Sequence, residues 1–157
     1  MPLITLDSLS LNPHLHQRLM GLDLGDKTIG IALSDTRGKI ATPLKTLTGK
    51  EREQGVRTLI NLIEEHNVAA LIVGMPYNMN GSEGERCAIT RAFVNRLLMS
   101  LDIPAVLWDE RLTTRSALAG LSEGKLSHKK QDQHVDKVAA ALILQGALDF
   151  LNPSCDL

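Results

Sequence analysis

Three acidic residues stand at positions where an unpaired carboxylate is costly. Asp23 lies inside an apolar run, LMGLDLG, that is typical of a buried strand. Glu110 closely follows a second apolar run at 104–108, and Asp136 precedes a series of apolar and small residues at helical spacing. A carboxylate in such surroundings needs a cationic partner or a metal ion. These three residues are therefore candidate metal ligands.

Carboxylate oxygens are the ligands that Mg²⁺ and Mn²⁺ prefer. Two such ions, about 3.5–4 Å apart, can activate a water molecule and stabilise the leaving oxygen when a phosphodiester bond is cleaved. This chemistry needs no nucleophilic side chain, and the five histidines are scattered without a Ser/His/Asp or Cys/His arrangement. We therefore interpret Asp23, Glu110 and Asp136 as catalytic residues that bind Mg²⁺ or Mn²⁺.

Each acid also has a purely structural interpretation. Asp23 could face solvent or cap a turn, and Glu110 could belong to the first turn of a solvated helix. Asp136 could be stabilised by the N-terminus of its own helix, although Asp132 is the more natural cap. The three positions taken together favour the metal site.

The elements that would position these acids follow from hydrophobic periodicity. Two short apolar runs, separated by Asp26-Lys27, and a third one next to them predict an antiparallel meander. Helical patterns then alternate with two further buried strands, which predicts parallel pairing. The predicted strands are 19–25, 28–34, 40–47, 69–74 and 104–108, and the predicted helices are 51–66, 84–101 and 133–151. This order predicts an α/β fold of the RNase H-like type: a mixed five-stranded sheet with helices on both faces.

Length and composition narrow the range of functions. A chain of 157 residues with 43% hydrophobic residues suits one domain. We assign it to 20–151, after a poorly ordered extension at 1–19 and before a tail at 152–157. A net charge of −1 gives no overall attraction to nucleic acid, and four aromatic residues are too few for rows of stacked bases. Two distant cysteines, no long apolar run and no signal peptide favour a cytoplasmic protein.

Four segments carry a resemblance to a known family. They are GLDLGDKTIGIALSD (21–35), VGMPYNMNGSEGER (73–86), WDERLTT (108–114) and VDKVAAALIL (135–144). In this order they resemble the signature blocks of the YqgF (RuvX) family in the RNase H-like superfamily, whose members are assigned as Holliday junction resolvases and pre-16S rRNA nucleases. The resemblance implies that Asp23, Glu110 and Asp136 are the acidic positions of the family's site. Where the family usually has Arg-Ile-Gly, this chain has Lys27-Thr28-Ile29-Gly30.

Several polar and basic residues near these blocks are expected to contact nucleic acid. The segment from Arg111 to Lys130 holds five basic residues and one acid, although a solvated loop would look the same. The loop after the fourth predicted strand leads to a helix start that could bind phosphate, or Ser82 could simply cap that helix with Glu85. The expected contacts are Lys27, Asn78, Arg86, Arg111, Thr113, Arg115, Lys129 and Lys130.

The leading hypothesis is a metal-dependent endonuclease that trims the 5′ end of precursor 16S rRNA during ribosome biogenesis. The alternatives are a Holliday junction resolvase-like nuclease, a phosphotransfer enzyme resembling the actin-like ATPases, and a non-catalytic RNA-binding or transcription factor. The ATPases enclose nucleotide between two such domains, and this chain supplies one. Resolving a junction needs two active sites and hence a dimer, whereas no dimerisation signal stands out. We therefore expect a monomer or weak homodimer whose partner is structured RNA, namely precursor rRNA, or, in the resolvase alternative, branched DNA; we expect no membrane partner.

Overall fold

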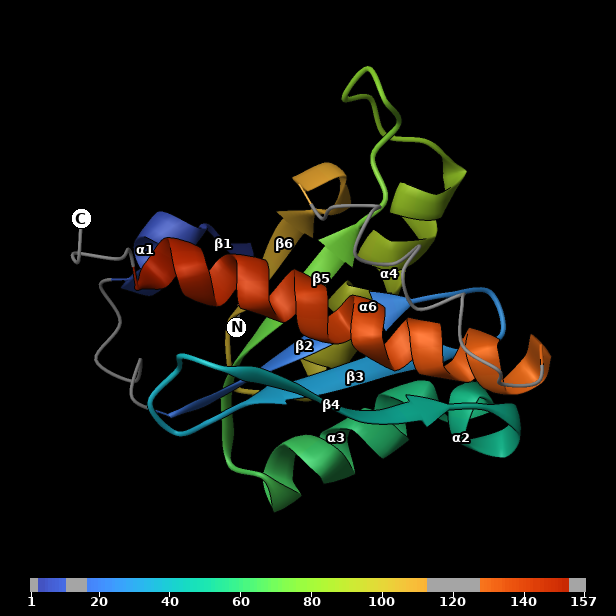
Figure 1. Ribbon diagram of the computed structural model, residues 1–157, viewed down its shortest axis with the longest axis horizontal. Coiled ribbons are helices and arrows are strands. Elements are labelled where there is room, and N and C mark those ends of the chain that lie inside the picture. The colour runs from blue at the N-terminus through green and yellow to red at the C-terminus, as the bar shows by residue number, and fades with distance from the viewer. Residues whose placement is uncertain (1–2, 11–16, 113–127, 153–157) are drawn as a thin grey trace.

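The computed structural model describes residues 3–10, 17–112 and 128–152, with the backbone alone at residue 10 and at 128–136. The strands, in chain order, are β1 (Leu3–Ile4), β2 (Arg18–Leu24), β3 (Ile29–Ser34), β4 (Ala41–Leu47), β5 (Val68–Met75) and β6 (Ala105–Asp109). The helices are α1 (Leu6–Ser10), α2 (Gly49–Glu53), α3 (Gly55–Glu65), α4 (Glu85–Met99), the short 3₁₀ helix η1 (Glu110–Leu112) and α6 (His128–Leu151) (Figure 1).

The strands form one mixed sheet in the spatial order β1-β6-β5-β2-β3-β4. β2, β3 and β4 form the predicted antiparallel meander, and β5 pairs parallel with both β2 and β6. The predicted RNase H-like arrangement is thereby confirmed. The predicted count of five strands is wrong, because β1 adds a sixth strand next to β6, with Leu3 opposite Ala105.

This sixth strand comes from the N-terminal extension, which we expected to be poorly ordered. In the structure, residues 3–10 form β1 and α1, and Leu9 of α1 is only 2% exposed. Leu9 packs with Leu148 of α6 and Val106 of β6 in one hydrophobic cluster. The extension therefore has a packing role, because its leucines recur at a spacing that a single helical turn can bury.

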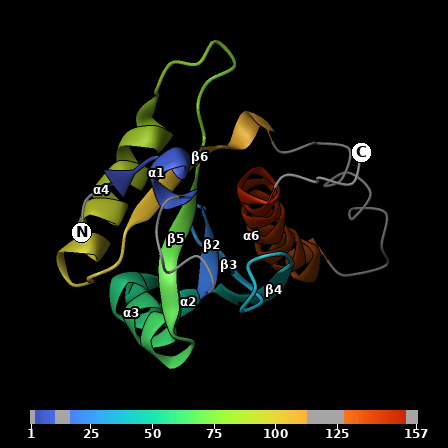
Figure 2. The same cartoon turned by 90° about the vertical axis from the view of Figure 1, so that its left-hand side faces the viewer.

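Helices cover both faces of the sheet, as predicted (Figure 2). On one face, α3 and α4 bury a cluster that includes Leu59, Phe93 and Leu97 against β2, β3 and β5. On the other face, α6 crosses the sheet and packs through Ala140, Leu144 and other small or apolar residues. The sheet is thus the middle layer of three.

Two predicted helices differ in their limits. The helix predicted at 51–66 is two helices, α2 and α3, which meet at Gln54 and Gly55. A β-carbon at Gly55 would lie 3.2 Å from the side chains of Ile29 and Phe93, so this turn is pressed against the core. The last helix, predicted from Gln133, begins at His128. None of the described helices is long and apolar enough to cross a membrane.

Glycines allow α6 to lie unusually close to the sheet. A β-carbon at Gly21 of β2 would lie 2.7 Å from the Ala140 carbonyl oxygen and 2.8 Å from the Leu144 β-carbon. Farther along the helix, a β-carbon at Gly146 would lie 2.8 Å from the Trp108 ring of β6. The Ala140 carbonyl cannot rotate away, and the buried Trp108 ring has little room to move, so α6 is fixed across β2 and β6 at these two points.

Gly21→Ala should therefore lower the free energy of unfolding by about 1–3 kcal/mol, the usual cost of overpacking. Urea unfolding measures this change. Gly84→Ala is the matched control: a β-carbon there meets Asn78 atoms only at 3.4 Å, so this variant should lose only the smaller amount that alanine costs at the N-cap of α4. An equal loss of stability in both variants would show that the contact between Gly21 and Ala140 does not limit the approach of α6.

Candidate active site

Asp23 lies near the carboxyl end of β2, on the face that α6 covers. Side chains alternate along a strand, so Asp23 shares a face with Gly21, which contacts Ala140 of α6. Its strand neighbours Leu22 and Leu24 point to the opposite face and belong to the other hydrophobic cluster. Asp23 is nevertheless partly exposed, because it stands close to the end of the sheet.

Glu110 begins η1, directly after β6, and reaches across β5. The strand between β6 and β2 is β5, and its residue at this level is Gly74, which pairs with Trp108 of β6. A β-carbon at Gly74 would lie 2.6 Å from Glu110 Oε1, so the carboxyl group occupies the space that a side chain at 74 would fill. Through this gap, the side chains of Glu110 and Asp23 form a hydrogen bond.

Burial raises the pKa of the Glu110 carboxyl above its ordinary value. The hydrogen bond with Asp23 and the positive charge of Arg86 act in the opposite direction, while the neighbouring Asp109 adds to the rise. Two carboxyl groups in hydrogen-bond contact must share a proton or a cation, since two negative charges at this distance repel each other. The pair therefore favours a bound positive charge.

Asp109, which our sequence analysis did not select, anchors the segment that carries Glu110. Its carboxylate accepts hydrogen bonds from the Arg111 backbone N–H at 2.9 Å and from Arg111 Nε and Nη2 at 3.0 and 2.6 Å. Hydrogen bonding to Arg111 holds the pKa of Asp109 below its ordinary value. Arg111 also donates to the Met79 carbonyl at 3.2 Å. Arg111, expected to bind nucleic acid, thus links η1 to the loop at 76–84.

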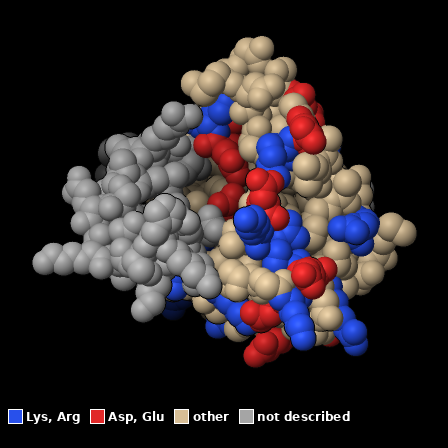
Figure 3. Space-filling view, turned by 90° about the vertical axis from the view of Figure 1, so that its right-hand side faces the viewer, with Lys and Arg blue, Asp and Glu red and all other residues tan. Residues whose placement is uncertain are grey.

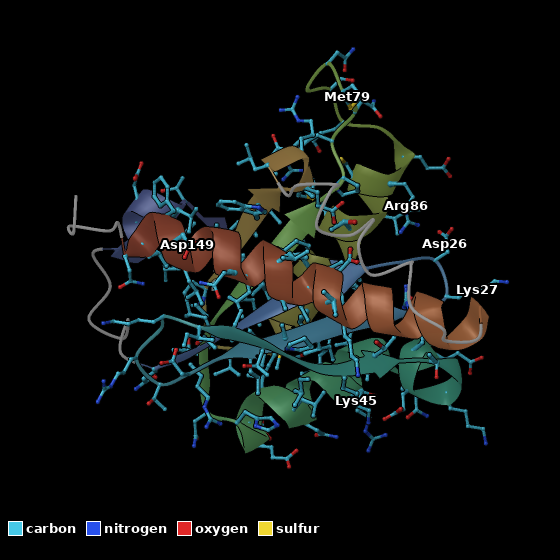
Figure 4. All side chains as sticks on the ribbon, viewed as in Figure 1. Asp26, Lys27, Lys45, Met79, Arg86 and Asp149 are labelled. Atoms are coloured by element: carbon cyan, nitrogen blue, oxygen red, sulfur yellow. The ribbon has the colours of Figure 1, made fainter. Side chains whose placement is uncertain are left out.

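Two arginines hold the turn that follows Asp23. Arg86, in the first turn of α4, donates to the Leu24 carbonyl at 2.9 Å and forms an ion pair with Asp26. Figure 4 shows Arg86 and Asp26 pointing toward each other from α4 and from the turn between β2 and β3. Arg52 of α2 donates to the Gly25 carbonyl at 3.1 Å. Arg52 was missed because its position in an apparently continuous helix gives no sign of this contact.

Lys27 and Asn78 have different surroundings. Lys27 is exposed in the turn between β2 and β3, and its side chain points outward (Figure 4). Asn78 is used within its own loop, where its side-chain amide donates to Ser82 Oγ at 3.0 Å. The alternative in which Ser82 caps α4 is wrong: the N-cap of α4 is Gly84, and Ser82 Oγ donates to Asn80 instead.

The remaining predicted contacts cannot be placed as side chains. Thr113 and Arg115 lie outside the described residues, and so does most of the basic segment from Arg111 to Lys130. Lys129, Lys130 and Asp136 belong to α6, where only the backbone is described at these positions. Their roles stay predictions.

The donor set at the strand ends suits a hard divalent cation. Asp23 of β2 and Glu110 of η1 offer carboxylate oxygens from either side of β5, and a proton held by the pair would leave when a cation binds. Within the residues whose side chains are described, no third His, Cys, Asp or Glu joins them in a metal-binding group. On the face shown in Figure 3, acidic side chains gather in a recess that is bordered by basic side chains.

The raised pKa of Glu110 predicts a stability change in metal-free protein. Because the folded-state pKa lies above the ordinary value, wild-type stability should fall as pH rises from that ordinary range through the folded pKa. Glu110→Gln removes this loss. Urea unfolding in EDTA should therefore show equal stability of the two proteins at low pH and a more stable variant at neutral pH.

Glu83→Gln is the matched control with the opposite sign. Hydrogen bonding to Arg91 holds the pKa of Glu83 below its ordinary value, so its charge stabilises the fold above that value. This variant should lose stability, relative to wild type, as pH rises. If Glu110→Gln followed the same trend as Glu83→Gln, the Glu110 carboxyl would not be destabilised by its burial.

Comparison with known proteins identifies relatives along nearly the whole chain. The family model RuvX, described as Holliday junction resolvase, matches residues 17–150. A protein of Rhizobium meliloti named "Putative pre-16S rRNA nuclease" is 44% identical over 151 residues, covering 96% of this chain and 92% of its own. A protein of the same name from Methylocella silvestris is 49% identical over 135 residues, covering 86% and 84%.

Solved structures share the fold at low sequence identity. RuvC of T. thermophilus in complex with Holliday junction substrate has a TM-score of 0.55 and 14% identity, covering 88% of this chain and 97% of that one. A second T. thermophilus RuvC structure has a TM-score of 0.53 and 16% identity, covering 85% and 95%. This likeness supports the RNase H-like fold, and the family match together with the close relatives shows that the chain belongs to the RuvX family.

Proposed function

We propose that this protein is a metal-dependent endonuclease that cleaves precursor 16S rRNA, with Asp23, Glu110 and Asp136 as its catalytic, metal-binding residues. The observation that carries the proposal is the hydrogen bond between the Asp23 and Glu110 side chains, formed across Gly74 at the carboxyl ends of three parallel strands. Ligands of open α/β sheets bind at this end. Such a substrate implies an enzyme of the cytoplasm.

The backbone supports Asp136 as the third acid. Ala140 of α6 contacts Gly21 of β2. From that contact, residue 136 lies one helical turn, about 6 Å, toward the start of α6. Asp23 lies two residues, about 6.6 Å, toward the end of β2. Both steps lead to the same end of the sheet, because α6 begins where β2 ends (Figure 1).

When bound, Mg²⁺ or Mn²⁺ supplies an activated water and a positive charge at the phosphate that is cleaved. The chain itself supplies the ligands and their placement. Asp23 is fixed by its strand, and Glu110 is held over Gly74 by the bond between Asp109 and Arg111. Arg86 fixes the backbone immediately after Asp23 and favours the charged form of Glu110. The site is thus arranged before substrate arrives.

The choice of RNA rests on the names of the relatives and on the surface. Cutting a four-way junction symmetrically needs two sites in a two-fold dimer. The large apolar side chains exposed in the described part of the chain are Ile40, Met79, Ile89, Met99, Leu112 and Phe150, of which Ile89 and Met99 share α4. Ile89 and Met99 are ten residues apart on that helix, about 15 Å, which does not favour one strong dimer interface. A monomer or weak dimer suits one cut in a precursor RNA.

Substitution of the acids tests the catalytic assignment. Asp23→Asn, Glu110→Gln and Asp136→Asn should each lower Mn²⁺- or Mg²⁺-dependent cleavage of precursor 16S rRNA by orders of magnitude, because a ligand set acts as one unit. The triple variant should be little worse than each single one. Cleavage rates under single-turnover conditions provide the measurement.

Asp102→Asn is the matched control, because Asp102 is an exposed acid at the opposite end of β6. It should cleave as wild type does. Wild-type activity in all three site variants would rule out the assignment. A large drop in melting temperature of Asp23→Asn would instead point to a structural role for that carboxylate.

Oligomeric state and substrate preference can be tested together. Sedimentation at micromolar concentration should give a monomer or a weak dimer, and the protein should cleave precursor 16S rRNA in preference to a four-way DNA junction. The reason is that one chain carries a single acidic site. A stable dimer that makes paired symmetric nicks in the junction and leaves the RNA intact would support the resolvase alternative.

A further inference from the structure

A second charged surface lies beyond the turn that follows Asp23. A groove of about 430 Å³ runs between α2, α3 and α4, and three arginines line it: Arg52, Arg57 and Arg96. We call it the arginine groove. Glu53 is the one acid in its lining, and Phe93, Gln54, Gly55, Val56, Ile60 and Asn61 complete it. The lining therefore has an excess of two positive charges in a protein whose net charge is −1.

The arginines of the groove are close enough to repel one another. The guanidinium groups of Arg52 and Arg96 lie 5.8 and 5.9 Å from the centre of the same Phe93 ring. Burial and the charges of Arg86 and Arg96 lower the pKa of Arg52, and Asp26 is the acid that opposes them. Such a gathering of like charges costs stability unless an anion is bound there.

Arg52 also has unused hydrogen-bonding capacity. Its Nη2 donates to the Gly25 carbonyl, while its Nε is buried and has no partner among the described atoms. Phe93 is almost fully buried, so it cannot stack on a base. It instead supports the two guanidinium groups, whose planar forks suit phosphate oxygens. The groove thus offers charge and donors, but its one aromatic ring is not available for stacking on bases.

Arg86 lies between the groove and the candidate active site and interacts with residues of both. Arg86 interacts electrostatically with Glu110, bonds to the carbonyl that follows Asp23, and repels Arg52. Arg52 in turn borders the groove. Figure 3 shows basic side chains running from the edge of the acidic recess down the same face. A polyanion held at the acids can therefore continue past Arg86 into the groove.

We propose that the arginine groove binds the sugar–phosphate backbone of the nucleic-acid strand whose scissile bond lies at Asp23 and Glu110. This inference rests on the proposed function, since it takes the acids as the point of cleavage. It adds a binding surface on the opposite face of the sheet from α6, formed by α2, α3 and α4. Because its contacts are to phosphate, the groove should bind strands of different sequence alike.

Arg57→Gln, Arg96→Gln and the double variant test the groove. Arg37→Gln is the matched control, since it removes the same charge from the exposed turn between β3 and β4 at the other end of the sheet. Binding of a labelled single-stranded RNA of about 20 nucleotides is titrated in EDTA between about 50 and 200 mM KCl. Thermal unfolding confirms that each variant is folded.

Each groove variant should weaken binding severalfold at low salt and flatten the slope of log affinity against log salt by about 0.7 for each phosphate that the variant no longer binds. The double variant should flatten the slope about twice as much. Arg37→Gln should bind as wild type does. Groove variants that match Arg37→Gln in affinity and slope would overturn the proposal.

The same titration separates this proposal from the proposed function, because it does not depend on cleavage. If the wild-type protein cleaves neither RNA nor DNA but the groove variants bind RNA more weakly, the groove proposal is upheld and the nuclease proposal is rejected. If the protein is an active nuclease but the groove variants bind RNA as tightly as wild type, the groove proposal is rejected and the nuclease proposal is upheld. Polyglutamate is added as a competitor at the same concentration of negative charge. If it displaces the RNA from wild type, and the groove variants weaken its binding too, the groove binds an acidic polypeptide and the proposal is overturned.

Discussion

The contact between the Asp23 and Glu110 carboxyl groups is the constraint on which the rest of the site depends. Two acids that share a hydrogen bond in a half-buried place are stable only with a proton or a cation between them. They come from β2 and from the residue after β6, so the strand between them must leave room. Gly74 does so, and any side chain there would displace Glu110 or Ile143 of α6. The donor pair therefore exists because β5 has a glycine at this level.

The order of the elements was accessible from the sequence because each has a clear periodicity. The alternation around Asp23 placed it in a strand, and the small and apolar residues after Asp136 indicated a helix that packs closely. The contacts of the site were not accessible in this way. The close approach of Glu110 to Gly74 depends on strand register, which periodicity does not fix for parallel strands.

The limits and the buried faces of the helices also depend on tertiary contacts, which the local sequence pattern does not show. The helical spacing within 84–101 predicts Ala88 and Ala92 on the buried side of α4, yet both are exposed and Cys87 and Thr90 are buried instead. Large side chains such as Phe93 determine the face, because they bury more apolar area than alanine does. Likewise, β1 can form because it pairs with the edge of β6, a contact that the local sequence does not show.

Although the net charge is −1, the fold places acidic and basic side chains in two separate regions. Acids concentrate where three parallel strands end, while arginines from α2, α3 and α4 lie beyond the turn after Asp23. The two groups do not neutralise each other: Asp109 is paired with Arg111 and Asp26 with Arg86, which leaves Glu110 and Arg52 with shifted pKa values of opposite direction. A divalent cation would relieve the repulsion among the acids. A chain of phosphates would likewise relieve the repulsion among the arginines. A nucleic-acid strand bound with its metal ions supplies both at once, so substrate and cofactor would each stabilise the folded protein by the charge they bring.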